Sequence, residues 1–391
     1  MKDFREKWLL NAGDTIKAGE HIYVITGEPL GFGGSAVLYP AKRNGSELSY
    51  AIKECFPNSP ERFVRKDGIV MVISEDDKEG KKLLEFYREM FQKECATGQS
   101  IRNFTGRSIG MWDTLNVQTI TMGNQTYDAS QGIYALLERM DGKGCSLSDI
   151  LNECRKEKSS LYTLRTGSLP NIYTTACIME QILRAVQGVH ESGYLFGDIQ
   201  INNIFFMDSR LGEGEIGFGC LFDFGCARPL LEDGYTKEIT DCKIFSTEGY
   251  IAPEVLHDND GHLRLGKQAD VYSAGKLMLL CLLTDGQDLV ESSISMKRLL
   301  QPYHGKKIGC SGAKLDLVNR ILEKALQVEP NKRYKDAEAM LADIIELKKL
   351  TELPKFRLSN NMSSPDYPVW DNRKKEIRAL KESMQRGENP M

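Results

Sequence analysis

One stretch, between Tyr194 and Glu254, constrains the fold of this 391-residue chain more than any other. Asp198 lies five residues before Asn203, in a polar loop that leads into the apolar run Ile204 to Phe206. Asp223 follows a second apolar run and begins the tripeptide Asp-Phe-Gly. Two carboxylates and an amide at strand boundaries can deprotonate a hydroxyl and hold Mg²⁺, which prefers hard oxygen ligands. This set suits phosphoryl transfer, which depends on positioning and charge neutralisation more than on covalent chemistry.

The stretch resembles the protein kinase family, because a catalytic loop, an Asp-Phe-Gly loop and an Ala-Pro-Glu motif at Ala252 to Glu254 follow one another in the family's order. The string AIKECFP, from Ala51 to Pro57, is similar to a bacterial branch of the eukaryotic-like (Hanks-type) serine/threonine kinases. The resemblance implies an α+β, bilobal fold with a small β-rich N-lobe, one main helix in that lobe, and a larger α-helical C-lobe. It also implies ATP, Mg²⁺ and a protein substrate that offers a Ser or Thr hydroxyl.

Changes of pattern along the chain predict four parts. Residues 1–20 form a short amphipathic extension that packs on the first lobe. Residues 21–140 form the N-lobe and residues 141–350 the C-lobe. Residues 351–391 are polar and lack periodicity, which is typical of a linker or tail, with one marginal helix near the end.

A glycine-rich segment, GFGGSA, follows a strand predicted over His21 to Leu30. Glycine lets backbone amides approach a phosphate closely and frees the φ angle. A plain β-hairpin turn is the alternative interpretation. Ala36 replaces the third glycine of the family pattern and adds only one methyl group. The resemblance implies that the whole segment binds ATP: Gly31, Phe32, Gly33, Gly34, Ser35 and Ala36.

Lys53 lies in an apolar strand pattern, where an inward-pointing ammonium group needs an anion. The alternative is a surface lysine whose stem covers apolar neighbours. A helix is predicted over Lys82 to Ile101, and Glu94 falls within its apolar face. A carboxylate on that face is costly unless it is paired, so Glu94 is the predicted partner of Lys53. In kinases this lysine is catalytic and holds the α- and β-phosphates of ATP.

A strand predicted over Ile133 to Met140 forms the edge of the N-lobe and the hinge to the C-lobe. The resemblance implies that backbone groups of Glu138 and Met140 bind adenine and that Leu137 guards the pocket behind it. The alternative is a buried strand that ends in a turn at Asp141-Gly142.

The catalytic loop keeps the groups that the family uses for chemistry. By resemblance, Asp198 is the catalytic base, and Asn203 and Asp223 are the ligands of Mg²⁺. Phe196 takes the place of the family's histidine, and it can still pack against Phe224 of Asp-Phe-Gly.

Other positions depart from the family pattern. Gly197 replaces the arginine that binds a phosphorylated activation loop. Gln200 replaces a lysine, and it can hydrogen-bond a γ-phosphate oxygen without adding charge. Gly98 replaces an apolar residue of the main helix that usually packs on the Asp-Phe-Gly phenylalanine. We therefore expect slower transfer, or a larger share of the charge neutralisation by Lys53, Mg²⁺ and loop amides. We also expect little effect of alanine at the activation-segment hydroxyls Thr236 and Thr240.

Residues far apart in the chain match architectural positions of the family. Glu254 needs a buried cation, and Arg333 is the partner that the family pattern implies. Asp270 begins an apolar helix and matches the aspartate that braces the catalytic-loop backbone. A central buried helix is predicted over Asn171 to His190, in which His190 is a satisfied helix-end residue and not a catalytic one.

The net charge and the apolar runs of the sequence argue against several classes of function. A formal net charge of −4 gives no basic footprint for nucleic-acid binding. The longest apolar run, Leu277 to Leu283, is too short to span a bilayer, and the charged N-terminus has no secretory apolar core. The ten cysteines are scattered without a CxxC pair, so we expect reduced thiols in a cytoplasmic protein. Nothing in the sequence indicates an oligomeric state.

Two other functions stay open beside a serine/threonine protein kinase. Gly-Asp with a downstream Asn also resembles aminoglycoside- and choline-type kinases, which act on small molecules, but those enzymes lack a peptide-binding loop such as Thr247 to Glu254. A nucleotide-binding pseudokinase would explain the departures, although all four residues expected to serve phosphate, metal and hydroxyl are present: Lys53, Asp198, Asn203 and Asp223. A tyrosine kinase is disfavoured, because the catalytic-loop arginine of that class is absent.

Overall fold

The computed structural model describes residues 3–59, 61–105, 111–138, 144–154, 172–209, 216–239, 249–256, 263–283 and 311–351. The chain divides into two compact units, residues 1–350 and 351–391, and nearly all described residues belong to the first. Met140, Thr240, Thr247 and the predicted tail lie outside the described residues. Within these ranges, no helix combines the length and apolar character that crossing a membrane requires.

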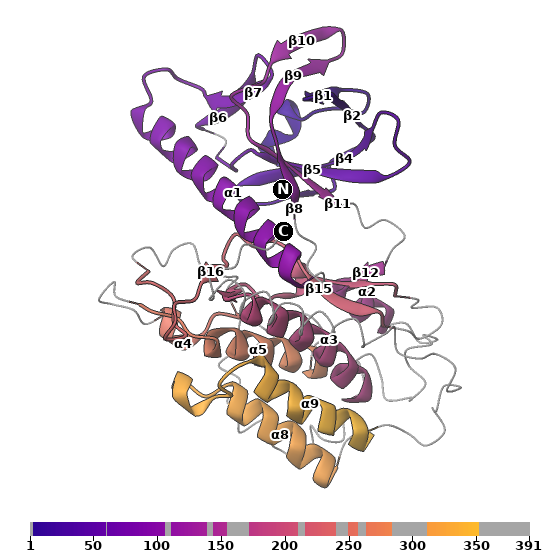
Figure 1. Ribbon diagram of the computed structural model, residues 1–391, viewed down its shortest axis with the longest axis vertical. Coiled ribbons are helices and arrows are strands. Elements are labelled where there is room, and N and C mark those ends of the chain that lie inside the picture. The colour runs from indigo at the N-terminus through magenta and orange to yellow at the C-terminus, as the bar shows by residue number, and fades with distance from the viewer. Residues whose placement is uncertain are drawn as a thin grey trace, which may run out of the picture. The chain divides into compact units, whose positions relative to one another are not determined.

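A nine-stranded antiparallel sheet forms most of the N-lobe, with β3 paired to β4 and the remaining strands in the order β10-β9-β1-β2-β4-β5-β11-β8 (Figure 1). Its strands are β1 (Thr15–Ala18), β2 (His21–Ile25), β3 (Gly31–Phe32), β4 (Ala36–Arg43), β5 (Ser49–Cys55), β8 (Met111–Leu115), β9 (Val117–Met122), β10 (Gln125–Asp128) and β11 (Tyr134–Glu138). β8 and β9 are almost continuous. Because β8 pairs with β11 and β9 pairs with β1, this long strand joins the two ends of the sheet and curls it.

The sheet begins earlier than the sequence predicted. Residues 1–20 were expected to be an extension, but β1 pairs with both β2 and β9. The sequence did not indicate this strand, because it is short and only Ile16 and Ala18 of its four residues are buried. The strand predicted over His21 to Leu30 ends at Ile25.

Helix α1 (Lys78–Thr105) is the one long helix of the N-lobe, and it extends beyond both predicted ends. It packs beside the sheet and reaches α3 of the C-lobe (Figure 1). Successive residues of a strand point to opposite faces of the sheet. On β5, Ile52 therefore points into the interior of the curled sheet, whereas Cys55 packs against Phe91 and Cys95 of α1. Lys53 shares the face of Cys55, so the sheet directs it toward α1.

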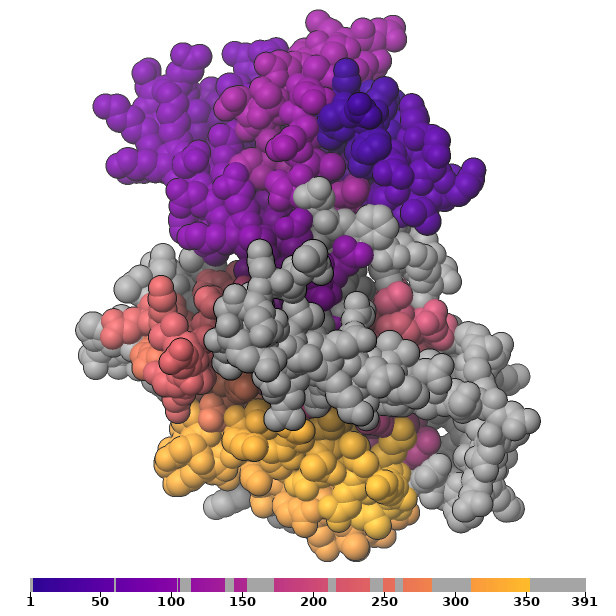
Figure 2. All heavy atoms as spheres, in the orientation of Figure 1, coloured from indigo at the N-terminus to yellow at the C-terminus, as the bar shows by residue number. Residues whose placement is uncertain are grey.

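The C-lobe is helical. Its helices are α2 (Leu147–Cys154), α3 (Ile172–Glu191), α4 (Pro253–Leu256), α5 (Gln268–Leu283), α8 (Ala313–Ala325) and α9 (Ala337–Thr351). α3 lies at the centre, and one hydrophobic core joins it to α5, α8 and α9. On the face shown in Figure 2, α8 and α9 form the outer surface of this lobe.

Short strands carry the segments between the helices. They are β12 (Gly144–Ser146), β13 (Tyr194–Leu195), β14 (Ile204–Met207), β15 (Phe218–Leu221) and β16 (Arg228–Pro229). β14 and β15 form an antiparallel hairpin on α3. The residues just before β14 and just after β15 therefore lie at the same end of the hairpin.

Candidate active site

Asp270, in the first turn of α5, holds the catalytic loop in place. Its buried carboxylate accepts hydrogen bonds from the backbone N–H of Phe196 (2.9 Å) and of Gly197 (2.8 Å). His190 Nε2, at the end of α3, lies 2.8 Å from the same carboxylate. The predicted brace is confirmed. His190 lies at the helix end as predicted, but only its Nε2 is paired, because the buried Nδ1 has no hydrogen-bond partner among the described residues.

The backbone at Gly197 has a conformation that favours glycine. Its φ is +80°, and a Cβ atom built there would lie 2.8 Å from the carbonyl oxygen of Cys226. Next to it, the ring of Phe196 packs edge-to-face on Phe224, with 5.5 Å between the ring centroids, as the sequence predicted. The phenylalanine that replaces the family's histidine therefore anchors Asp-Phe-Gly through packing.

Asp198 is held by two side-chain amides. Asn203 Nδ2 donates to Asp198 Oδ2 at 2.7 Å and to its backbone carbonyl at 3.1 Å. Gln200 Nε2 donates to the same Oδ2 at 2.8 Å. The amide of Gln200 thus orients the carboxylate of Asp198, and its predicted contact with a phosphate of ATP stays a prediction. Both donors are neutral, so they fix the ionised carboxylate without the positive charge that a lysine would bring.

Asn203 and Asp223 meet at one end of the β14–β15 hairpin. The N–H of Phe222 donates to the carbonyl of Asn203 at 3.2 Å, so Asp223 directly follows the last rung of the ladder. Asp223 has a φ of +64°, and its side chain is 51% exposed. Because Asn203 uses its Nδ2 on Asp198, its oxygen is the atom suited to a cation. A half-exposed carboxylate and an amide oxygen fit Mg²⁺, which takes few protein ligands and keeps several waters.

Lys53 joins the two lobes electrostatically. Its Nζ is hydrogen-bonded to Glu94 of α1 and lies 3.8 Å from Asp223 Oδ1 of the C-lobe. Burial opposes the charge on Lys53, but Asp223 and Glu94 outweigh that effect and raise the pKa of the ammonium. Burial raises the pKa of Glu94 to about 7, an effect that Lys53 opposes and that Asp223 reinforces. The structure thus brings Lys53 together with Glu94, the glutamate that the helical periodicity predicted as its partner.

The glycine-rich segment is a tight hairpin between β3 and β4. Gly31 pairs with Leu38, and the N–H of Gly33 donates to the carbonyl of Ala36 at 2.9 Å. A Cβ atom at Gly31 or Gly34 would meet no protein atom within 4 Å, so glycine leaves open space beside the backbone there. The two interpretations of the sequence are compatible, because the turn is a hairpin that also leaves room for a ligand.

The structure describes only the first part of the predicted hinge, up to Glu138. Glu138 ends β11, where it pairs with Tyr50 of β5. Leu137, the predicted guard of the back pocket, packs on the cluster of Ala36, Cys55 and Phe91. It thus lies on the face of the sheet that carries Lys53.

The segment after the activation loop is fixed from two sides. The hydroxyl of Ser273, on α5, donates to the carbonyl of Tyr250 at 2.8 Å. Arg333, which is fully buried, donates to both oxygens of Glu254 at 2.8 and 2.6 Å, which confirms that predicted pair. The sequence did not single out Ser273, because one serine on an apolar helix is a weak signal.

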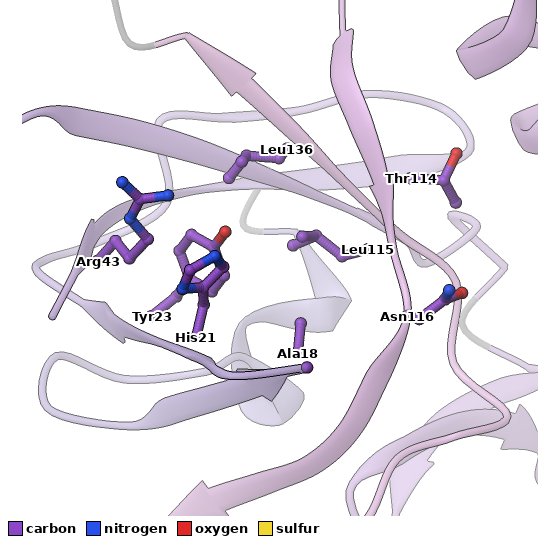
Figure 3. Close-up of a pocket in the computed structure, with 9 residues that line it drawn as sticks. Ala18, His21, Tyr23, Arg43, Thr114, Leu115, Asn116 and Leu136 are labelled. Atoms are coloured by element: carbon purple, nitrogen blue, oxygen red, sulfur yellow. The ribbon is translucent and has the colours of Figure 1, made fainter.

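A cavity of about 410 Å³ lies elsewhere in the N-lobe (Figure 3). Tyr23, Arg43 and Leu136 are among the residues that line it. Ala135 pairs with Lys53, and its neighbour Leu136 points to the opposite face of the sheet, into its curled interior. None of the residues that line the cavity is a predicted catalytic or ATP-binding residue.

Comparison with known proteins agrees with this geometry. The family model described as "Protein kinase domain" matches residues 89–344, which is more than half of the chain. The chain is 26% identical over 229 residues to the serine/threonine-protein kinase ppk34 of Schizosaccharomyces pombe, covering 58% of each chain. It is 28% identical over 187 residues to a probable serine/threonine-protein kinase, zyg-1 of Caenorhabditis briggsae, covering 48% of this chain and 23% of that one. It is 25% identical over 201 residues to the serine/threonine-protein kinase PknL of Mycobacterium tuberculosis, covering 50% and 45%.

A solved structure, "PpkA-294 apo form", covers 87% of this chain and 99% of its own, with a TM-score of 0.56 and 19% identity. This likeness confirms the predicted fold class, a β-rich lobe followed by a helical one. The chain spans less than two thirds of the length of each of the curated relatives named above. The glycine-rich hairpin and Lys53 precede the range matched by the family model, so their assignment rests on geometry.

Proposed function

The chain belongs to the protein kinase domain family, and on that premise we propose that it is a kinase that uses ATP and Mg²⁺ to phosphorylate Ser or Thr hydroxyls of protein substrates. One observation carries the proposal. Lys53 of the N-lobe is paired with Glu94 and lies 3.8 Å from Asp223 of the C-lobe, so groups for phosphate and for metal converge between the lobes.

The mechanism assigns each group a task. ATP binds with its phosphates beneath the hairpin from Gly31 to Ala36, and Lys53 neutralises the α- and β-phosphates. Asn203 and Asp223 would hold Mg²⁺, which supplies further neutralisation of phosphate charge. Asp198 orients the acceptor hydroxyl and takes its proton, and a plain carboxylate suffices because the transition state is loose. With the neutral Gln200 in place of lysine, Lys53 and the loop amides carry more of the remaining charge.

A protein substrate is favoured over a small molecule by the segment from Gly249 to Glu254. Ser273 and Arg333 fix this segment against the helical lobe. A rigid backbone next to Asp198 suits an extended peptide, whereas a small molecule needs no such support. The bacterial branch, the cytoplasmic location and the lack of nucleic-acid partners remain predictions.

The described part of the activation segment, residues 226–239, is held by hydrogen bonds to residues 263–265. Backbone bonds join Thr236 N–H to Leu265 O and Ile239 N–H to Leu263 O, both at 2.9 Å. Arg264 Nε donates to the carbonyl of Thr236 at 2.9 Å, and its Nη2 donates to Asp233 Oδ2 at 2.7 Å. These contacts support our proposal that phosphorylation of this segment does not control activity.

Thr236 requires a correction to the expectation from sequence. Its side chain is buried, and its hydroxyl accepts a hydrogen bond from Leu265 N–H at 3.0 Å. Alanine at Thr236 would leave that N–H without its partner, so a loss of stability is expected even if no phosphate is ever attached. Phosphatase treatment of the wild-type protein is the cleaner test, and we expect no change in rate.

Arg264→Ala is expected to lower kcat/KM for a protein substrate by about three- to tenfold, the value of one or two hydrogen bonds, and to leave KM for ATP unchanged. Asp233→Asn is the matched control, because it removes only the exposed ion pair, which is worth little. Steady-state kinetics with the two substrates varied separately measures both effects. Wild-type activity of Arg264→Ala would show that the segment is held by its backbone bonds alone.

The raised pKa of Glu94 predicts a pH profile. As the pH falls through about 7, Glu94 takes up a proton and attracts the Lys53 ammonium less, so log kcat/KM for ATP should rise with pH on the acid side and then level off. The measurement uses excess Mg²⁺ throughout. Glu94→Gln should be slower and lack this inflection. If the variant keeps the same inflection, another group is responsible.

Incubation with γ-labelled ATP, Mg²⁺ and a generic protein substrate tests the proposed function. Label on serine or threonine supports it. Label only on small acceptors indicates a small-molecule kinase, and ATP binding without any transfer indicates a pseudokinase.

A further inference from the structure

The N-terminal segment reaches the glycine-rich hairpin through one buried arginine. The 3₁₀ helix η1 (Phe4–Trp8) begins at Asp3, whose side chain accepts the N–H of Arg5 at 3.0 Å. Arg5 is only 1% exposed, which is rare for this residue type unless it is paired.

The guanidinium of Arg5 touches both sides of the hairpin. Nη1 donates to the carbonyl of Phe56 at 2.6 Å and to that of Ala36 at 3.3 Å. The group also stacks over the ring of Phe32, 5.4 Å from its centroid. Phe32 ends β3 and Ala36 begins β4. One side chain therefore contacts both strands where they enter the turn.

Phe56 extends the same contact to the tip of the turn. Its N–H donates to the carbonyl of Ser35 at 3.0 Å, while its carbonyl accepts from Arg5. Arg5 is therefore connected to the turn through the backbone of one residue, Phe56, in addition to its direct bond to Ala36.

The charge of Arg5 is balanced within the segment. Asp3 accepts from Nε at 2.8 Å and from Nη2 at 2.6 Å, a two-point contact that fits the planar guanidinium. Burying this charge costs free energy, and an apolar side chain could fill the same space. The arginine therefore points to a role in positioning the groups that it hydrogen-bonds, because stability alone would not require it.

The segment has other anchors besides Arg5. Phe4 packs edge-to-face on Phe56 with 6.3 Å between centroids, Leu10 is buried, and Arg65 Nε donates to the carbonyl of Trp8 at 2.7 Å. These contacts can keep residues 3–10 in place when Arg5 is changed, which makes its effect on the hairpin separable from folding.

We propose that Arg5 is a positioning residue that holds the glycine-rich hairpin in the conformation that closes over the phosphates of ATP. The inference rests on the proposed function only in taking ATP as the ligand. A hairpin fixed in advance loses less conformational freedom on binding, so Arg5 favours ATP affinity more than the transfer step.

The test compares Arg5→Met, which keeps the length of the stem and loses every donor, with Arg5→Lys, which keeps the charge and part of the hydrogen bonding. Arg5→Met is expected to raise both KM and the directly measured Kd for Mg-ATP by about tenfold, as expected for loss of charge-assisted hydrogen bonds, with kcat changed less than about twofold. The KM and Kd of Arg5→Lys for Mg-ATP should lie between those of the wild-type protein and those of Arg5→Met. Amide hydrogen exchange at residues 33–36 should become faster in Arg5→Met.

Phe4→Leu is the matched control, because it disturbs the packing of the same segment and leaves every Arg5 hydrogen bond in place. It should lower Tm while Kd for Mg-ATP stays at the wild-type value. If Arg5→Met does not fold, Arg5→Lys and Phe4→Leu decide between the two roles. Wild-type Kd and unchanged exchange in the Arg5 variants, or an equal rise of Kd in Phe4→Leu, would overturn the proposal. Because Kd is measured without turnover, the test stands even if the wild-type protein transfers no phosphate.

Discussion

Asp198→Asn is expected to lower kcat for phosphorylation of a protein substrate by about 10³-fold, within the range of a lost general base, and to change KM for ATP little. Asparagine keeps an oxygen that can accept the hydrogen bonds from Gln200 and Asn203, so the loop retains its conformation while the base is lost. Alanine should also abolish transfer, but it would leave the amide of Asn203 without this partner.

Asp208→Asn provides the matched control for that variant. Asp208 is an exposed C-lobe residue with a φ of +57°, a conformation that asparagine tolerates. The same loss of one negative charge should leave kcat within about twofold of wild type. Full activity of Asp198→Asn beside a normal control would show that another group takes the proton.

Lys53→Met should lower kcat/KM for ATP by about 10²- to 10³-fold, the usual loss when one group that stabilises transition-state charge is removed. The variant also leaves Glu94 without its cation, so the buried carboxyl should become protonated. Steady-state kinetics and direct measurement of ATP affinity separate the effect on binding from the effect on transfer. Lys42→Met, at an exposed position on the neighbouring strand β4, is the control.

A double-mutant cycle sharpens this second prediction. If Glu94 acts only by holding Lys53, then Lys53→Met/Glu94→Gln should be no slower than Lys53→Met alone. Additive losses would mean that Glu94 has a further task, such as positioning α1.

The sequence pattern identified Lys53 and Glu94 because each is a charged residue in an apolar stretch. Glu94 could be chosen among the glutamates of α1, since it lies on the apolar face, where a carboxylate needs a partner. Asp270 and the pair of Glu254 with Arg333 were available only through the family resemblance. No local pattern connects positions so far apart in the chain.

Other features depend on tertiary contacts that a local pattern does not contain. Arg5 lies among charged residues in a short helix, which is typical of a solvated terminus, and its burial follows from acceptors at Ala36 and Phe56. Arg65 pairs inside the sheet with Glu54, and neither residue is marked by periodicity. The hydrogen bond from Gln200 to Asp198 is also a tertiary detail that no sequence pattern indicates.

The backbone at Gly197 limits which residues could occupy this position. A single mutation to arginine would restore the residue that other family members use to sense phosphorylation. That arginine would begin with a Cβ atom 2.8 Å from the carbonyl oxygen of Cys226, on a φ of +80°. It would need compensating changes around Cys226 before it could serve a phosphate. An arginine at this position would therefore require a rebuilt loop around Cys226, and a single substitution would not supply one.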